Sequence, residues 1–442
     1  MGRVGSLEVV DYANTTSTLV NRIAAIGGVG GTGTTARYIL PSLALNLDFT
    51  TGTLDPRITF TRASTGSYYN SVGVLTQAAS NAPRFDYDPV TLQPKGLLIE
   101  ESRTNLLTYS EQFDNAVWAS NPSPIAANAT IAPDGNATAD KSTPTSSLAA
   151  HYVSQTFTYV SGTTYTFSVY AKMSGYSVLQ LATSGTAFTT IPYANFNLST
   201  GQVAGIFNGG IATISSVGNG WYRCTLTATA NGSGSYGLFW GIYPSGNPTR
   251  LETYAGDGAS GIYLWGAQLE AGSFATSYIP TVASQVTRAA DVAVMTGTNF
   301  SSWYNQSEGT VYAEGDYGRN SVATYIASLS DSDLGSAVNR FQIAFNASNN
   351  LSCAAVAGGV VIVPGISSSI STNTFKSVFA VKSGDYAAMI NANVPGTNTA
   401  VGIPTVDRLK LGVASNGTSS FLNGHIKRLT YFNKRLTNQQ LQ

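Results

Sequence analysis

Charged side chains are scarce in this sequence of 442 residues. They make up 10% of the chain, against about 25% in an average soluble protein. The 23 lysines and arginines balance 23 aspartates and glutamates, so the formal net charge is zero. Binding to nucleic acid or to an anionic membrane surface needs clustered positive charge. The composition therefore argues against nucleic acid as the main partner and against a polybasic membrane contact.

Histidine, cysteine and long apolar runs are also scarce. His151 and His425 are the two histidines, which leaves little for a His-based metal site or a His-dependent catalytic triad. Of the two cysteines, Cys224 alternates with Tyr222 along an apolar strand face and Cys353 lies in another candidate domain, so we expect free thiols and no disulfide. No apolar run reaches about 18 residues and the N-terminus lacks an apolar core, so we expect neither a transmembrane helix nor a signal peptide.

Apolar residues and turn formers are abundant. The chain is 43% hydrophobic and 11% aromatic and contains 45 glycines, enough apolar material for real cores and many turns. Several segments alternate apolar and polar residues with a period of two, which is typical of strands with one buried face. They are 163–171 (TTYTFSVYA), 222–230 (YRCTLTATA), 340–346 (RFQIAFN) and 408–413 (RLKLGV). The sequence thus predicts an all-β protein.

We expect two tandem antiparallel β-sandwich domains after an N-terminal arm. The arm, residues 1–45, ends in a Gly/Thr-rich hinge. Residues 46–286 form the first, jelly-roll-like sandwich, and 287–442 form the second, lectin-like one. The pattern leaves open whether 46–108 is a separate subdomain or wraps the first sandwich.

Two local signals lie near the end of the chain. The spacing of Ile426, Leu429 and Tyr431 breaks the period of two and predicts a β-bulge. Thr437 followed by Gln440 predicts a capping box.

Three stretches together resemble bacteriophage and prophage virion proteins, mainly tail-fibre and receptor-binding components. They are FTRAS (60–64) with NAPRFDYDPVTLQPKGLLIEESRTNLLTYSEQFDNAVW (81–118), GNGWYRCTLTAT (218–229), and IYLWGAQLEAGSFATSYIPT (262–281) with TRAADV (287–292). The central region resembles the jelly-roll of carbohydrate-binding modules and galactose-binding-like domains. The last part, from 308–317 to 421–441, is similar to a laminin-G or concanavalin-type sandwich.

The resemblance implies a protein on the outside of a phage virion. Its implied function is that of a tail-fibre or receptor-binding component that attaches to host surface polysaccharide without catalysis. The arm would hold other virion proteins, and a homotrimer would supply avidity. Two alternatives stay open: a capsid or baseplate decoration protein with no ligand, and a polysaccharide depolymerase.

Sugars are recognised by aromatic faces that stack on C–H surfaces, together with polar groups that bind hydroxyls. Trp240 in YGLFWGIYPSG is the preferred stacking residue, and RLETYAGDG (250–258) offers polar groups. Burial of the aromatic candidates would instead favour decoration without a ligand. The predicted glycan-binding residues are Trp240, Tyr243, Arg250, Tyr254, Asp257 and Trp265.

The sequence predicts no cofactor, and a structural calcium ion is the one alternative, beside a solvated loop, that stays open. Asp331 and Asp333 in SLSDSDLGS have a spacing that could chelate a hard cation, although the other EF-hand positions are missing. Carbohydrate-binding jelly-rolls often carry a structural Ca²⁺, so the resemblance favours calcium without assigning its ligands.

The sequence shows no paired acids for glycoside hydrolysis. That reaction needs two carboxylates about 5–9.5 Å apart. Glu100 and Glu101 are adjacent and would point to opposite faces of a strand, whereas Glu101 and Arg103 would share a face as a structural ion pair. Glu270 and Asp291 are also expected to be structural. We therefore expect no enzymatic activity.

Overall fold

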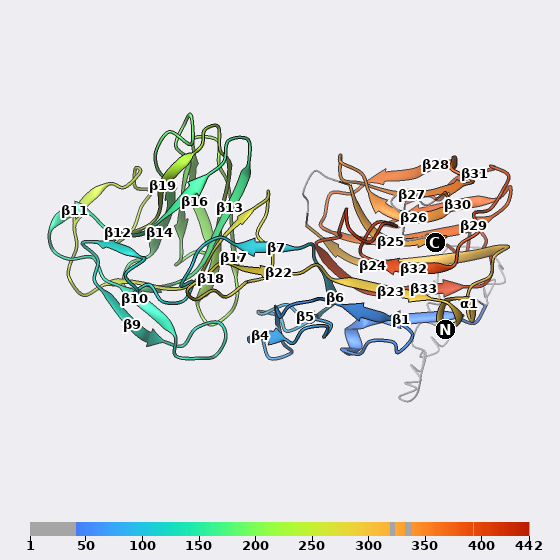
Figure 1. Ribbon diagram of the computed structural model, residues 1–442, viewed down its shortest axis with the longest axis horizontal. Helices are drawn as coiled ribbons and strands as arrows, with labels where there is room; N and C mark the ends of the chain where they lie inside the picture. Colours follow the sequence, from blue (N-terminus) through green and yellow to red (C-terminus); the bar gives the residue numbers. More distant parts are fainter. Residues whose placement is uncertain (1–40, 319–322, 332–337, 392, 442) are drawn as a thin grey trace, which may run out of the picture.

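The computed structural model describes residues 41–318, 323–331, 338–391 and 393–441. Almost all regular structure in these residues is β-strand, in two antiparallel sandwiches that lie side by side (Figure 1). The predicted all-β fold with two tandem sandwiches is confirmed. The helical elements described are the short α1 (Thr298–Ser301) and the 3-10 turn η1 (Phe49–Thr51), neither of which could cross a membrane. The predicted arm lies largely outside the described residues.

The first sandwich consists of two sheets, which we call sheet C and sheet D. Residues 163–171 and 222–230 pair antiparallel in sheet D, with Val169 opposite Cys224, and both face the core. Sheet C contains β16 (Gln202–Phe207), β15 (Tyr193–Asn197), β14 (Val178–Thr183), β19 (Gly234–Tyr243), β12 (Tyr152–Tyr159) and β8 (Ala119–Asn121). Sheet D contains β17 (Ile211–Ser216), β18 (Trp221–Thr229), β13 (Thr164–Ser174), β21 (Gly261–Ala271), β10 (Ala139–Ser142) and β9 (Ile125–Thr130), and β11 (Leu148–Ala150) pairs with β20 (Thr253–Ala255) at the side.

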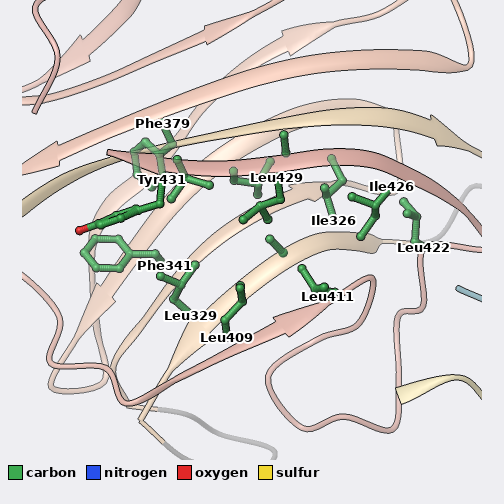
Figure 2. Packing of buried hydrophobic residues seen from close by; sticks show 14 of the residues in the cluster. Ile326, Leu329, Phe341, Phe379, Leu409, Leu411, Leu422, Ile426, Leu429 and Tyr431 are labelled. Carbon is green, nitrogen blue, oxygen red and sulfur yellow. The ribbon is translucent and has the colours of Figure 1, made fainter. Parts of the chain in front are cut away.

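The second sandwich packs sheet A on sheet B. Figure 2 shows Leu409 and Leu411 of one sheet and Leu429 and Tyr431 of the other in its core. Sheet A contains β31 (Gly396–Asn398), β30 (Tyr386–Ile390), β29 (Thr374–Lys382), β24 (Glu308–Tyr317), β33 (Gly424–Phe432), β6 (Pro94–Ile99) and β5 (Phe85–Tyr87), with β1 (Leu45–Asp48) on β33. Sheet B contains β2 (Thr59–Thr61), β23 (Val292–Thr296), β32 (Arg408–Leu411), β25 (Thr324–Ser330), β26 (Arg340–Phe345), β27 (Asn350–Ala357) and β28 (Val360–Ser369).

Residues 45–99 contribute strands to the second sandwich. β1 and β6 both pair with β33, and β2 pairs with β23. This sheet membership differs from the expected grouping of 46–286 as one unit, because the partners of these strands lie near the far end of the chain. The hairpin of β3 (Gly66–Tyr69) and β4 (Leu75–Ala78) follows β2. The pair of β7 (Arg103–Asn105) and β22 (Val286–Arg288) crosses between the sandwiches (Figure 1).

The smaller sequence signals are confirmed. The register between β24 and β33 shifts between Ile426 and Arg428, which is the predicted bulge. Thr437 and Gln440 exchange capping-box hydrogen bonds, and the backbone N–H of each is held by the side chain of the other. Cys224 and Cys353 are both free and buried.

A buried charge cluster, which we call the joint, lies where the two sandwiches meet. Asp291 accepts from Arg84 at 2.5 Å and from Arg62 at 3.1 Å, and Glu100 lies 2.7 Å from Arg84 and 3.5 Å from Arg288. All five side chains are at most 6% exposed. Each guanidinium therefore has a carboxylate partner, as buried charges require.

Glu100 also connects the joint to the first sandwich. Its carboxylate accepts hydrogen bonds from the backbone N–H and the hydroxyl of Ser277, in the segment that follows β21. Burial alone would raise the pKa of Glu100, but Arg288 and Arg84 hold it well below its usual range. Asp291 and Glu270 are buried, and the predicted ion pair of Glu101 with Arg103 is present at 2.5 Å.

Candidate functional site

Trp240 and Trp265 cannot be stacking residues, which corrects the prediction from sequence. Trp240 is 1% exposed, and its ring packs on Trp118 in the core of the first sandwich, at a centroid distance of 4.9 Å. Trp265 is also 1% exposed and packs against Tyr170 and Tyr278. A ring with no exposed face cannot contact a sugar, and both rings serve packing.

Tyr243 and Tyr254 line a cavity at one end of β19. Tyr243 is buried and Tyr254 half-buried, and their ring centroids are 5.5 Å apart. The Tyr254 hydroxyl donates to the carbonyl of Ile242 at 2.5 Å, which fixes the ring beside the strand. Residues 244–248 and Glu252 complete the lining of this cavity of about 260 Å³. These two predicted residues thus do meet at one site, with limited exposure.

Residues 244–252, which we call the strap, cross the outer face of sheet C. The side chain of Asn195 on β15 donates to the carbonyl of Pro248 at 2.7 Å, and that of Gln180 on β14 donates to the carbonyl of Thr249 at 3.1 Å. Gln180 also accepts the backbone N–H of Leu251 at 2.8 Å. These buried amides face away from the core, so their hydrogen-bonding groups need the strap as a partner.

Arg250 in the strap lies beside aromatic rings on the same outer face. Its Nε and Nη2 both donate to the carbonyl of Thr183, at 3.0 and 2.6 Å. Its guanidinium carbon lies 5.8 Å from the centroid of the Phe239 ring, within reach of a cation–π contact. Burial lowers the pKa of Arg250, and no carboxylate of the described residues raises it again.

A row of aromatic side chains runs across this face. Strand register places Phe239, Ala182, Tyr193 and Phe207 side by side on β19, β14, β15 and β16. The rings of Tyr193 and Phe207 stack at 4.3 Å with an interplanar angle of 11°. The Tyr152 ring meets Phe239 edge-on at 4.9 Å. We call Tyr152, Phe207 and Phe239, all half-buried, together with Arg250 the aromatic platform.

Glycines let the rings of β19 lie flat on the sheet. A Cβ on Gly237 would come within 2.6 Å of the Phe239 ring, and one on Gly241 within 3.0 Å of the Tyr243 ring. The four residues alternate along one face of the strand. A flat, partly exposed ring can present its face to a ligand, as sugar stacking requires.

The platform was missed because of strand parity. In GLFWGIY, the preferred Trp240 faces the core, and its neighbour Phe239 lies on the opposite, outer face. The signal that could have found the site is the alternation Gly237, Phe239, Gly241, Tyr243, with a small residue before each ring. Core residues on one face and flat rings on the other both look apolar in sequence.

Asp257, the one acid among the predicted glycan-binding residues, and Glu252 of the strap are held by local turns. Asp257 is exposed, and its carboxylate accepts the backbone N–H groups of Ala259 and Ser260, which lowers its pKa. Glu252 is exposed and accepts from the backbone N–H and the hydroxyl of Thr249, at 2.8 and 2.9 Å. Among the described residues, neither carboxylate forms a hydrogen bond or an ion pair with Arg250.

The predicted calcium ligands are described only in part. Asp333 lies outside the described residues. Asp331 accepts a hydrogen bond from the side chain of Asn339 at 2.8 Å, while its other oxygen is buried without a hydrogen bond. The described residues contain no cluster of three or more acidic, histidine or cysteine side chains that could hold a metal. Structural calcium therefore stays a prediction.

No protein-family model and no curated protein matches this sequence. Among solved structures, the chain is similar to the CBM40 of the Ruminococcus gnavus IT-sialidase, with 12% identity and a TM-score of 0.28 over 31% of this chain and 82% of that one. It is similar to the NanB sialidase of Streptococcus pneumoniae, with 17% identity and a TM-score of 0.28 over 34% and 25% of the two chains. It is also similar to the Trypanosoma rangeli sialidase, with 9% identity and a TM-score of 0.27 over 69% and 59%.

Proposed function

We propose that this chain is a glycan-binding protein without catalytic activity, whose ligand lies on the aromatic platform of sheet C. The observation that carries the proposal is the row of flat rings beside Arg250, next to the cavity under the strap. Rings supply apolar surface for the C–H faces of a sugar, and the guanidinium and the strap supply hydrogen bonds. Shallow, open sites of this kind bind weakly, and several copies are needed for firm attachment.

The setting that we propose is the exterior of a phage virion, as a tail-fibre or receptor-binding component. The support is the resemblance of FTRAS, TRAADV and the neighbouring phrases to virion proteins. In this setting the arm of residues 1–45 attaches to other virion proteins, and a homotrimer displays three platforms toward host polysaccharide. Oligomerisation would multiply a weak single-site affinity through effective concentration.

Decoration of the particle without a ligand is the second candidate. The burial of Trp240, Tyr243 and Trp265, three of the four aromatic residues predicted to contact a sugar, favours it, whereas the fourth, Tyr254, is half-buried. The half-buried Phe207, Phe239 and Tyr152 favour binding instead.

Lack of catalysis is part of the proposal. Among the outward-facing residues of β12, β14, β15 and β19 and the residues of the strap, Glu252 is the one carboxylate. Glycoside hydrolysis uses two. A depolymerase would release reducing ends from host polysaccharide, and we expect none.

The test is binding of the full chain to host envelopes and to an array of immobilised bacterial polysaccharides. Phe239→Ala removes the half-buried ring of β19, and we expect it to reduce binding roughly two- to tenfold, since stacking on an aromatic ring contributes about 0.5–1.5 kcal/mol. The matched control is Tyr325→Ala, a half-buried aromatic residue in the second sandwich. If the oligomer binds neither material, or if both variants lose binding equally, the platform is not a glycan site.

A further inference from the structure

The guanidinium of Arg250 is a partly buried charge without a carboxylate partner. Nε and Nη2 share the carbonyl of Thr183, and no hydrogen bond from Nη1 is seen to any described residue. The acids nearest in sequence, Glu252 and Asp257, are occupied by Thr249 and by the turn at 259–260. One edge of the guanidinium is thus anchored to the sheet, and three N–H groups, two on Nη1 and one on Nη2, are left to donate elsewhere.

Burying part of the Arg250 charge costs free energy unless an anion binds beside it. Removing a cation from water is unfavourable, and a carbonyl and an aromatic ring compensate only part of the loss. The lowered pKa of Arg250 has burial as its first cause, in agreement with this geometry. An oxyanion on the free edge would restore the missing interaction, and a guanidinium fits a carboxylate or sulfate with two parallel hydrogen bonds.

We infer that the ligand of the aromatic platform is an acidic glycan, whose carboxylate or sulfate group pairs with Nη1 of Arg250 while a neighbouring sugar stacks on Phe239. This inference rests on the proposed glycan-binding function and adds the chemical class of the ligand. The guanidinium carbon of Arg250 lies 5.8 Å from the centroid of the Phe239 ring, so a sugar unit whose acidic group pairs with Arg250 has the next unit over Phe239.

The experiment compares polymers that differ in charge alone. Binding of the full chain is measured for polygalacturonate against its methyl ester, and for dextran sulfate against dextran. We expect at least about tenfold tighter binding to one acidic polymer than to its neutral counterpart, the usual size of a charge-assisted hydrogen bond. The two pairs distinguish carboxylate from sulfate recognition.

Variants assign the preference to Arg250. Arg250→Gln should remove the preference for the acidic polymer, while Arg250→Lys, which keeps the charge but not the fork, should retain part of it. Arg57→Gln is the control, because it removes the same charge from a residue that pairs with Asp55 in another part of the molecule. Urea unfolding of each variant shows whether the fold is kept.

The outcomes separate this inference from the proposed function. Equal binding of charged and neutral polymers that Phe239→Ala abolishes would overturn the acidic ligand and leave the glycan site intact. A preference that Arg57→Gln removes as well as Arg250→Gln would reflect overall charge and would also overturn the inference. Absence of binding to every polymer and to host envelopes would refute the proposed function, and this inference with it. If Arg250→Gln does not fold, the comparison of acidic with neutral polymers on the unaltered chain and on Arg250→Lys still tests the inference.

Discussion

Buried arginines have different interaction partners at the joint and at the strap. At the joint, Arg62, Arg84 and Arg288 lie within 4.0 Å of Asp291 or Glu100, and all are nearly fully buried. At the strap, Arg250 donates to a backbone carbonyl and lies over a ring, without an acid. The charges of the joint are neutralised by acids of the same chain, whereas an unpaired charge at a partly open surface is available to a ligand.

The joint brings together sequence phrases that are far apart in the chain. Arg62 belongs to FTRAS, Arg84 to NAPRFDY, Glu100 to GLLIEES, and Arg288 and Asp291 to TRAADV. These phrases, far apart in the chain, meet in one charge cluster. Their charged residues therefore contribute to the contact between the two sandwiches.

The largest effect is expected at the joint. Asp291→Ala leaves Arg62 and Arg84 buried with less compensation, and we expect it to lower the free energy of unfolding by about 3–5 kcal/mol in urea titrations. Asp407→Ala, which breaks an exposed pair with Arg408, should cost less than about 1 kcal/mol. A loss below about 1 kcal/mol for Asp291→Ala would show that the cluster does not stabilise the fold.

Neighbouring residues of β19 should separate stability from binding. Trp240→Ala empties a core position and should lower the free energy of unfolding by about 3–5 kcal/mol. Phe239→Ala should cost roughly 1 kcal/mol, because its ring is half-buried on the outer face, while glycan binding falls. Urea unfolding and polysaccharide binding, measured on both proteins, check this. If Trp240→Ala lost glycan binding and Phe239→Ala lost stability instead, the ligand would contact the other face of β19 and the platform would not be the site.

A histidine in sheet A should make stability depend on pH. His425 is buried between Asp316, at 2.7 Å from Nδ1, and Asp86, at 2.9 Å from Nε2, with Lys95 near Asp316. Burial lowers its pKa, but the two carboxylates outweigh burial and hold it above the ordinary value of 6.5. The charged form stabilises the fold below pH 6.5, and this contribution is lost as the pH rises through the folded-state pKa.

The measurement is urea unfolding between pH 6 and pH 10. We expect the free energy of unfolding to fall by roughly 1–3 kcal/mol over this range, the contribution of hydrogen bonds to a charged group. His425→Gln should be less stable at pH 6 and should lack this fall. An unchanged slope in the variant would assign the pH dependence to other groups.

The smallest effect is expected for the stability of Arg250→Gln. The hydrogen bonds to Thr183 are offset by the cost of burying an unpaired cation, so the free energy of unfolding should change by less than about 1 kcal/mol. Urea titration beside Asp291→Ala tests this contrast directly. A loss of about 3 kcal/mol or more would make Arg250 a structural residue like those of the joint.

Local patterns in the sequence predicted local structure well. Alternation in 163–171 and 222–230 identified paired strands, the spacing after Ile426 identified a bulge, and Thr437 with Gln440 identified a capping box. These features depend on residues close together in the chain, whose side-chain period and hydrogen-bonding groups decide the outcome. For the same reason the ion pair of Glu101 and Arg103 could be expected from spacing alone.

Predicting the site required long-range information. Both faces of β19 carry large apolar side chains, so the local pattern did not show that Phe239, and not Trp240, faces outward. The strap becomes part of the site only because Gln180 and Asn195, more than fifty residues earlier, bind its carbonyl groups on the outer face.

Asp333 lies outside the described residues, so the calcium prediction is untested.

The sequence by itself determined the all-β class, the strands and the two sets of side chains that alternate on each, because a period of two follows from backbone geometry. The tertiary structure decided which set of β19 faces the core, and that β1, β2, β5 and β6 complete the second sandwich beside β23 and β33. Such pairings depend on which distant surfaces bury the most apolar area and leave the fewest charges without a partner, and no local pattern encodes that choice.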